Sequence, residues 1–431
     1  DCVVVVCNDA AAPGIYPLSL HDALPVERKL TMSGRKDGGL AAASKAILAL
    51  AVGTFAIGTG EFAAMGLLPQ MAQSMHTDIP QTGQAISAYA LGVVVGAPLI
   101  AVVAARMSRR SLLVGLMAWF AVTNGLGTLA GTLGMLDLAR FISGLPHGAF
   151  MGVAALVAAG LVERGYRGRA VGRVFSGLTI ANVVGAPLAT YVGGSMNWRL
   201  AYVLIGLIGA ACCLMVLAWV PYDQPNRARS AISELAAFSR KQVWYVMGTV
   251  AVGCGGMFCV YTYFSVTLQE VTGVPTWGVP LFQAIWGVGM CVGAWAGGYL
   301  MDKSLKWTTV GAFLWNAFAL GLFALVAHNI WLTALAVFML GGGIALSPAM
   351  QVRLMDVAAD AQTLAASMNH AAFNLANALG AWLGGVVLAS GFGLSDTGWA
   401  GMGLSLVGLL LFALSLLSEK RDNSRTATAH G

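Results

Sequence analysis

A single carboxylate interrupts a long apolar stretch near the start of the chain. The stretch "AVGTFAIGTGEFAAMGLLP" spans residues 51–69, and Glu61 is its only charged residue. Desolvation favours the protonated form of a carboxyl group and a nearby cation favours the ionised form, so such a group can bind and release a proton as its surroundings change. Glu61 is therefore the candidate proton carrier.

A second segment places an arginine and a histidine on one helical repeat. In "RFISGLPHGAFMG", residues 140–152, Arg140, Gly144, His147 and Met151 are three or four positions apart, so a helix puts them on one face. A neighbouring row that favours close packing against another helix consists of Gly144, Gly148 and Gly152. In the simpler interpretation, Arg140 extends to the surface and His147 binds a backbone carbonyl.

The composition indicates a membrane protein. Of 431 residues, 58% are hydrophobic and 10% charged, whereas soluble domains average about 45–50% and about 25%. The 55 glycines fit close helix approach in lipid. The net charge of +6 is typical of basic cytoplasmic loops and does not indicate a nucleic-acid partner.

Apolar stretches of about 20 residues can cross a bilayer, and they predict an all-α polytopic protein with twelve transmembrane helices. The spans are 46–68, 84–104, 111–133, 138–162, 171–192, 200–220, 243–268, 279–300, 308–327, 331–350, 365–389 and 399–417. The expected parts are an N-terminal segment (1–45), a six-helix bundle (46–220), a linker (221–242), a second six-helix bundle (243–417) and a tail (418–431).

The distribution of basic residues predicts the orientation. Of the 24 Lys and Arg residues, all but Arg140 and Arg199 fall in the termini, the linker and the even-numbered connections. Cytoplasmic loops carry such an excess, so both termini and the linker are predicted to be cytoplasmic, in a bacterial inner membrane. Glu61 and Arg140 then lie at similar depth, where they could form a pair.

Glu61 is the only acidic residue predicted well inside a span. A charged side chain at the bilayer centre costs about 2.5–3.5 kcal/mol on insertion scales, so an acid in this position indicates a function.

An internal repeat divides the chain into two halves. "GAPLIAVVAAR" at 96–106 aligns with "GAWAGGYLMDK" at 293–303, an offset of 197. "ANVVGAP" at 181–187 aligns with "ANALGAW" at 376–382, an offset of 195, with Asn182 over Asn377. The pairs join the second span to the eighth and the fifth to the eleventh, which predicts two parallel six-helix halves.

The chain resembles the major facilitator superfamily over residues 46–417, in particular the drug:proton antiporter branch that includes arabinose-efflux-permease-like and sugar or nucleoside exporters. The resemblance rests on "GTGEFAAMGLLP", "RFISGLPHGAFMG" and "GLTIANVVGAPLATYVGG". It implies two pseudo-symmetric six-helix bundles that work by alternating access. It also implies that Arg140 is the family's helix-4 arginine, which biases the proton affinity of the acid.

Two further motifs resemble those of the family. In the fifth span, glycine and proline would bend the helix and pack it tightly, as in the family's antiporter motif; these residues are Gly177, Gly185, Pro187, Gly193 and Gly194. The loop signature G-x-x-x-D-[RK]-x-G-R-[RK] is degenerate in "AVVAARMSRR", where Ala105 replaces the acid. The conformational loop residues retained in the two copies are Arg106, Arg109 and Arg110, and Gly298, Asp302 and Lys303.

Polar side chains in the predicted spans are candidates to line a central cavity. They are Tyr89, Asn124, His147, Asn182, Tyr261, Tyr263, Gln283, Asn316, Asn369, His370, Asn374 and Asn377. Few are charged, so the lining suits a small amphipathic or hydroxylated molecule such as a sugar, a nucleoside or a drug. Each asparagine could instead join two helices.

The sequence favours a transporter over two alternatives. A membrane enzyme would need a second catalytic group beside Glu61 or His147, and no such motif is present. No G-x-x-x-x-G-K-[ST] phosphate loop occurs, so the expected energy source is the proton gradient, with no cofactor and no metal. A facilitator without proton coupling, or a sensor, would keep the fold and make Glu61 structural. The expected partners are a small-molecule substrate and the bilayer, with the chain a monomer.

The first 31 residues differ from the rest of the chain. They contain one short valine run, three prolines and no helical period, and Met32 opens "MSGRKDGGL". We expect residues 1–31 not to belong to the native fold. The seven cysteines show no metal-ligand spacing and are expected to be buried thiols.

Overall fold

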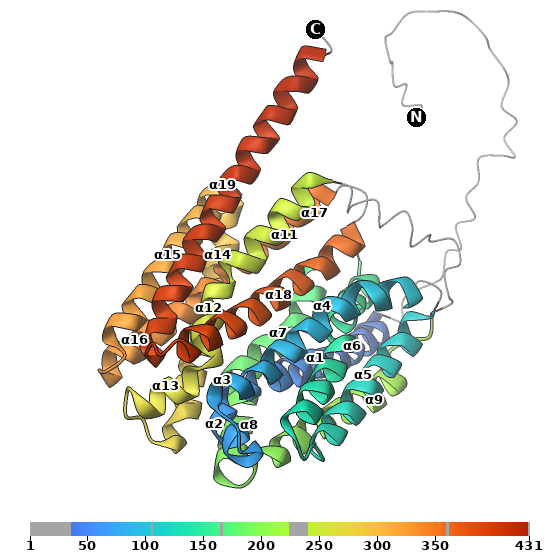
Figure 1. The fold of residues 1–431 in the computed structure, drawn as a ribbon. Helices are drawn as coiled ribbons and strands as arrows, with labels where there is room; N and C mark the ends of the chain where they lie inside the picture. Colours follow the sequence, from blue (N-terminus) through green and yellow to red (C-terminus); the bar gives the residue numbers. More distant parts are fainter. Residues whose placement is uncertain (1–35, 105–106, 164–166, 224–239, 359–361, 430–431) are drawn as a thin grey trace, which may run out of the picture. The chain divides into compact units, whose positions relative to one another are not determined.

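The computed structural model describes residues 36–104, 107–163, 167–223, 240–358 and 362–429, and residues 42–431 form one compact unit. Every regular element in these ranges is a helix (Figure 1). The first half contains α1 (Lys36–Gly66), α2 (Leu68–Met75), α3 (Ile79–Thr82), α4 (Gln84–Ala104), α5 (Arg109–Gly127), α6 (Leu133–Gly160), α7 (Arg167–Ile180), η2 (Ala181–Gly185), α8 (Ala186–Ser195) and α9 (Trp198–Trp219). The second half contains α11 (Lys241–Gly253), α12 (Gly255–Thr262), α13 (Phe264–Glu270), η4 (Thr276–Gly278), α14 (Val279–Lys303), α15 (Leu305–Val326), α16 (Ile330–Gly342), η5 (Gly343–Ala345), α17 (Leu346–Ala358), α18 (Gln362–Ala389), η6 (Leu394–Asp396) and α19 (Thr397–Ala429). The predictions for residues 1–31 and for most of the linker fall outside the described residues.

Helices cover each of the twelve predicted spans, and in the described part of the chain 11 of them are long and apolar enough to cross a membrane. The exception is the third span, where α5 begins with two arginines and carries Thr123 and Asn124 in its last turns. α5 packs against both α6 and α9, so it is part of the bundle despite its lower hydropathy.

The boundary between the third and fourth spans differs from the prediction. α5 ends at Gly127, and α6 begins at Leu133 because the Thr132 hydroxyl accepts a hydrogen bond from the Met135 backbone N–H at 3.3 Å. α6 therefore starts five residues before the predicted position 138, and Asp137 lies inside it. Asp137 therefore lies in a candidate span, close to its start, whereas the prediction concerned acids well inside a span.

Glycines bring α4 and α6 together, and the second half repeats the arrangement. A Cβ atom at Gly92 would collide with the Phe141 carbonyl oxygen, and one at Gly289 would collide with that of Phe338. Gly144 stands in the same relation to the Tyr89 carbonyl as Gly341 does to that of Trp286. These pairs are separated by the offset of 197 found in the sequence, so the repeat extends to the helix contacts.

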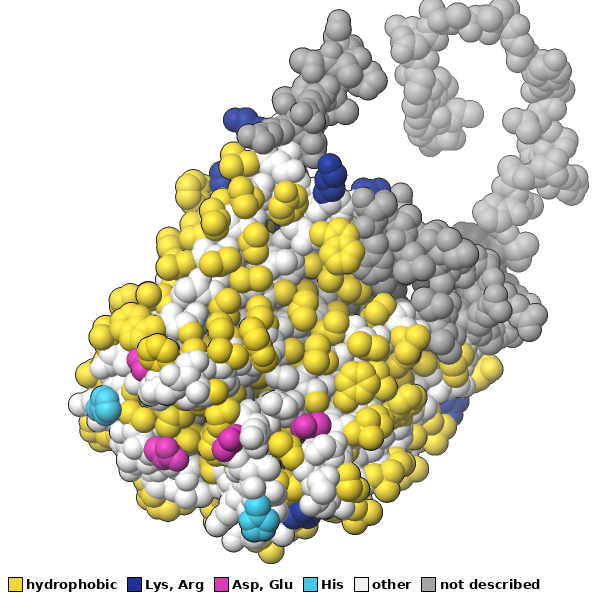
Figure 2. Space-filling model, viewed as in Figure 1, with side chains coloured by type: hydrophobic (Ala, Val, Ile, Leu, Met, Phe, Trp, Pro, Cys, Tyr) yellow, Lys and Arg dark blue, Asp and Glu magenta, His cyan; other side chains and the backbone are white. Residues whose placement is uncertain are grey.

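The outer surface of the bundle is apolar. Large side chains such as Trp331, Trp295 and Leu129 are mostly exposed, and Figure 2 shows hydrophobic side chains spread over the helices that face the viewer. In this view the Asp and Glu side chains lie toward one end of the unit. A surface of this kind fits contact with lipid acyl chains.

The two halves contact each other mainly through α18 and α14 of the second half. α4 packs against α18, and α14 packs against η2 and α8. Side-chain hydrogen bonds cross between the halves from Ser265 to the Met65 carbonyl at 2.7 Å and from Ser87 to the Ala378 carbonyl at 3.3 Å. The Tyr263 hydroxyl also lies beside Gly83. These contacts between the halves therefore lie toward the end of the bundle that carries α2, α3 and α13 (Figure 1).

Candidate functional site

Glu61 lies on α1 where the two halves meet. Its residue is 6% exposed, and its Oε1 accepts a hydrogen bond of 3.3 Å from Nδ2 of Asn377 on α18. The neighbouring Phe62 packs in the hydrophobic core of the second half, whereas Ala63 packs in that of the first. A carboxylate of one half is thus bonded directly to an amide of the other, a contact that the sequence did not predict.

Arg140 approaches Glu61 without forming an ion pair with it. Nη1 of Arg140 donates to the Gly60 carbonyl at 3.2 Å, one residue before the carboxylate. The one ion pair among the described residues joins Arg353 to Glu419 at 2.7 Å. Arg140 and Glu61 therefore lie near each other, as predicted. The contact of Arg140, however, is with the backbone carbonyl of Gly60 and not with the Glu61 carboxylate.

The Arg140 guanidinium lies between two tyrosine rings. Its Cζ atom is 4.2 Å from the centroid of the Tyr89 ring and 5.3 Å from that of the Tyr202 ring. Cations over aromatic faces are stabilised electrostatically, more so when they are buried. Arg140 is 3% exposed, so the rings supply part of the environment that water would provide, and the simpler interpretation that Arg140 reaches the surface does not describe this structure.

His147 and Tyr89 are joined across the α4–α6 contact. The Tyr89 hydroxyl lies 3.2 Å from Nδ1 of His147, and both side chains are buried. Gly144 allows this approach because a side chain there would collide with the Tyr89 carbonyl. The predicted row of Arg140, Gly144 and His147 thus faces α4, with Tyr89 in contact with both ionisable members.

His370, Asn374 and Asn369 of α18 are further candidate cavity residues. The His370 ring stacks on Phe175 of α7 with 5.7 Å between centroids, a further contact between the halves. Asn374 donates to the His370 carbonyl at 3.0 Å, and Asn369 is buried.

The remaining candidate cavity residues are buried, some in contacts between helices and some in hydrogen bonds within their own helix. Tyr261 stacks on Trp286 at 4.1 Å, Gln283 donates to the Phe62 carbonyl at 3.4 Å and Tyr263 to the Ala381 carbonyl at 2.9 Å. Three asparagines also bind partners: Asn124 the Phe120 carbonyl at 2.8 Å, Asn182 the Leu178 carbonyl at 2.9 Å and Asn316 the Ser405 hydroxyl at 3.4 Å. Their part in a substrate cavity stays a prediction.

The glycines of the fifth span pack against the helix that carries Glu61. Gly177 lies against the Ala51 carbonyl and Gly185 against Thr59, both on α1, with no room for a side chain. The helix widens into a π-helix over Ala181–Gly185, and Pro187 stands in the first turn of α8, where its missing N–H costs least. Gly193 lies against Leu67, and Gly194 has more space.

The loop motif contains an acid that sequence reasoning missed. The backbone N–H groups of Arg109 and Arg110 donate to the Asp223 carboxylate at 3.1 and 3.2 Å, and the Arg110 side chain donates to the Leu217 carbonyl. Asp223 thus occupies the N-terminus of α5, a favourable place for a carboxylate. The only sequence feature that could have indicated this contact was the acid in "VPYDQP" at the end of the sixth span.

In the second copy of the motif, Nζ of Lys303 lies 4.7 Å from the centroid of the Tyr299 ring. Gly298 has open space beside it. Arg106 and the side chain of Asp302 lie outside the described part of the chain.

Asp137 is a second acid within a candidate span. It is half-buried on α6, and its Oδ1 is buried without a hydrogen-bond partner in the described structure. It lies three residues before Arg140, close to the start of the helix. No group of three His, Cys, Asp or Glu side chains that could hold a metal ion occurs among the described residues.

The family model of the Major Facilitator Superfamily matches residues 50–317 and 298–431. The inner membrane transport protein YdhP of Escherichia coli (strain K12) is 37% identical over 379 residues, which cover 88% of this chain and 97% of that protein. A probable sugar efflux transporter of Helicobacter pylori is 27% identical over 379 residues, covering 87% of this chain and 95% of the relative.

Solved structures agree in fold. The crystal structure of a bacterial homologue of the human lysosomal transporter Spinster, in an inward-facing and unoccupied conformation, superposes with a TM-score of 0.66. It is 14% identical and covers 87% of this chain and 95% of its own. The predicted fold of two six-helix bundles is confirmed.

Proposed function

Because the chain belongs to the Major Facilitator Superfamily and is a multi-pass membrane transporter, we propose that it exports a small molecule in exchange for protons, with Glu61 as the proton carrier. The proposal concerns the coupling, the direction and the substrate. It is supported by the position of Glu61 and by the similarity to a relative named as a sugar efflux transporter.

The observation that carries the proposal is the hydrogen bond between Asn377 and Glu61. It joins α18 to α1 across the two halves. A hydrogen bond from an amide to an ionised carboxylate is stronger than one to a neutral acid. Protonation of Glu61 therefore weakens a link between the halves, so the protonation state and the relative position of the halves are coupled.

Arg140 provides a second effect that couples protonation of Glu61 to conformation. A nearby cation favours the ionised form of a carboxyl group, and burial favours the neutral form. A movement of α6 that takes the guanidinium away from Gly60, and hence from Glu61, favours proton binding. Its return favours proton release.

The exchange cycle follows from these two effects. On the predicted topology, the end at which α2, α3 and α13 meet is the outer end, and in the proposed cycle this structure is assigned to the state that faces the cytoplasm. Glu61 loses its proton in this state as substrate enters from the cytoplasm. In the outward-open state, the acid takes up a proton from the exterior after substrate has left.

The substrate class is a small amphipathic or hydroxylated molecule. Amides, tyrosines and histidines near the contact between the halves offer hydrogen bonds with little fixed charge, and Tyr261 with Trp286 offers an aromatic wall. Such a set of groups fits sugars, nucleosides and neutral drugs better than strongly charged molecules.

Transport in proteoliposomes with an imposed pH gradient tests the proposal. A panel of sugars, nucleosides and uncharged drugs is screened for uphill accumulation by the full chain. The exposed acid Glu270 provides the control variant, Glu270→Gln. Gradient-driven accumulation of one class by wild type and control, lost in Glu61→Gln, supports antiport, whereas equilibration that ignores the gradient would identify a facilitator.

A further inference from the structure

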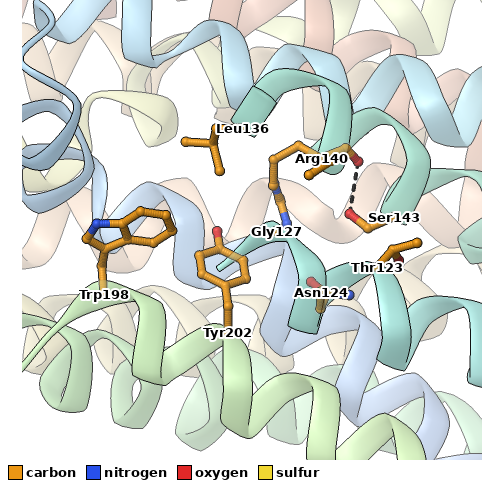
Figure 3. A pocket seen from close by; sticks show the side chains of 9 residues that line it. Thr123, Asn124, Gly127, Leu136, Arg140, Ser143, Trp198 and Tyr202 are labelled. Atoms are coloured by element: carbon orange, nitrogen blue, oxygen red, sulfur yellow. Dashed lines mark hydrogen bonds between the residues drawn. The ribbon is translucent and has the colours of Figure 1, made fainter. Parts of the chain in front are cut away.

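A small cavity lies beside Arg140. It measures about 10 Å³, which is room for one water-sized molecule or ion. Figure 3 shows the Arg140 side chain extending between Tyr202 and Asn124, with Leu136 nearby. The lining comes from α5, α6 and α9, and it consists of Thr123, Asn124, Gly127, Leu136, Ala139, Arg140, Ser143, Trp198 and Tyr202.

The unsatisfied polar atoms around this cavity include strong donors. Nε and Nη2 of Arg140 have no hydrogen-bond partner in the described structure, and neither does the Tyr202 hydroxyl. Both residues are 97% buried, since each is 3% exposed. Buried donors of this kind are normally satisfied by protein or by a bound species.

Three other polar groups of the lining already donate to backbone carbonyls, whereas the Trp198 indole N–H, like Nε and Nη2 of Arg140, is buried without a partner in the described structure. The Thr123 hydroxyl donates to the Trp119 carbonyl at 2.8 Å, the Ser143 hydroxyl to the Arg140 carbonyl at 2.9 Å, and the Asn124 amide to the Phe120 carbonyl at 2.8 Å. The unpartnered donors left for a ligand are therefore those of Arg140, Tyr202 and Trp198. Those of Arg140 carry a fixed positive charge.

That charge forms no direct ion pair in the described structure. A guanidinium stays protonated in proteins, and no ion pair involves Arg140 within the described ranges. Burial of a charge is costly unless it is paired, and the tyrosine rings offset only part of that cost. A small anion would satisfy the free N–H groups and the charge together.

We propose that this cavity binds one monatomic anion of the size of chloride, held by Nε and Nη2 of Arg140 and by the Tyr202 hydroxyl. The space excludes carboxylates and phosphates. Chloride is slightly larger than water, so a small shift of the Tyr202 ring accompanies binding. The three helices that line the site, α5, α6 and α9, all belong to the first half.

The anion site is linked to the protonation of Glu61. The titratable or charged groups around Arg140 are Glu61 on α1, Tyr89 on α4 with His147 behind it, Asp137 on α6 and Tyr202 on α9. An ionised Glu61 supplies negative charge near Arg140 and competes with an anion, whereas a protonated one does not. This part rests on the proposed function: anion binding is tighter at low pH.

Halide binding to the purified full chain in detergent tests the site. Thermal stability is titrated with bromide against gluconate at constant ionic strength, and crystals grown in bromide are measured for anomalous scattering. We expect saturable stabilisation and one anomalous peak beside Arg140. Tyr202→Phe weakens binding by about tenfold or more because it removes a hydrogen bond to a charged ligand, and it leaves the fold stable because the lost hydroxyl has no protein partner.

The control is Tyr191→Phe, which makes the same chemical change on an exposed tyrosine and leaves binding unchanged. Absence of both the peak and the stabilisation in wild type, with density for water only, overturns the site. Glu61→Gln separates the two proposals: tight binding at all pH values supports both, and binding that depends on pH as in wild type supports the site while it contradicts Glu61 as the titrating group.

Discussion

At the scale of single residues, the site consists of one acid whose two neighbours act on it differently. Asn377 binds the carboxylate directly, and Arg140 reaches only the carbonyl one residue before it. A direct ion pair would hold Glu61 ionised through the cycle. The indirect arrangement keeps the cation near enough to influence the acid and leaves the proton exchangeable.

Asn377→Ala removes the amide that links the halves. Because a hydrogen bond to a charged group contributes about 1.5–3 kcal/mol, we expect the population with α4 and α18 apart to rise by about tenfold or more. Spin labels at Gln81 and Leu388, which lie beside the contact between α3, α4 and α18, report it by distance measurement. Ser390→Ala, at the end of α18, is the control, and an unchanged distance distribution in Asn377→Ala speaks against the link.

Arg140→Ala removes the cation while leaving the hydrophobic length of α6 intact. Coupled transport should fall to background with normal membrane insertion, and Arg140→Lys should restore it only in part because an ammonium lacks the planar donor fork. Gradient-driven transport in proteoliposomes measures both. Full activity of Arg140→Ala would exclude the role.

At the scale of elements, glycine fixes the helix contacts that position the site. Gly144→Ala places a methyl group against the Tyr89 carbonyl and forces α4 and α6 apart, which should cost about 1–3 kcal/mol. Gly115→Ala is the matched control because nothing lies within 4 Å of its Cβ position, so helix propensity alone should stabilise it slightly. Thermal unfolding in detergent compares the two, and equal effects would contradict the packing role.

Most elements could be predicted from the sequence because apolar length and glycine repeats are local signals. Asp137 was missed because Thr132 starts α6 earlier than hydropathy indicates. The contact of Asn377 with Glu61 was missed because 316 residues separate them and depth within a helix says nothing about which face meets which. Asp223 was missed because a cap on a distant helix leaves no local pattern.

At the scale of the whole molecule, the account depends on which end of the bundle is the outer one. Basic residues predict that residues 221–242 are cytoplasmic and that the connection at Ser395 is external. Single cysteines at Ser230 and Ser395 can be labelled in intact cells with an impermeant reagent, with the unsubstituted chain as background. We expect labelling at position 395 only, and labelling of position 230 from outside would reverse the orientation and the direction of transport.

The two halves carry unequal chemistry on a shared scaffold. At the repeat offset of 197, Tyr89 corresponds to Trp286 and Arg140 to Val337, so the charged and hydrogen-bonded cluster belongs to the first half and the stacked aromatic rings to the second. Rocking of one half against the other then changes the contact of Asn377 with Glu61. The proposed movement of Arg140 relative to Glu61 is a shift of α6 within the first half.

Substrate-induced proton release from the purified protein tests the central claim most directly. A substrate identified in the transport screen is added to wild type, Glu61→Gln and Glu270→Gln in weakly buffered detergent solution with a pH indicator. The account predicts proton release by wild type and by Glu270→Gln, and none by Glu61→Gln. Undiminished release by Glu61→Gln would place the proton on another group, with His147 the next candidate, and would contradict the account.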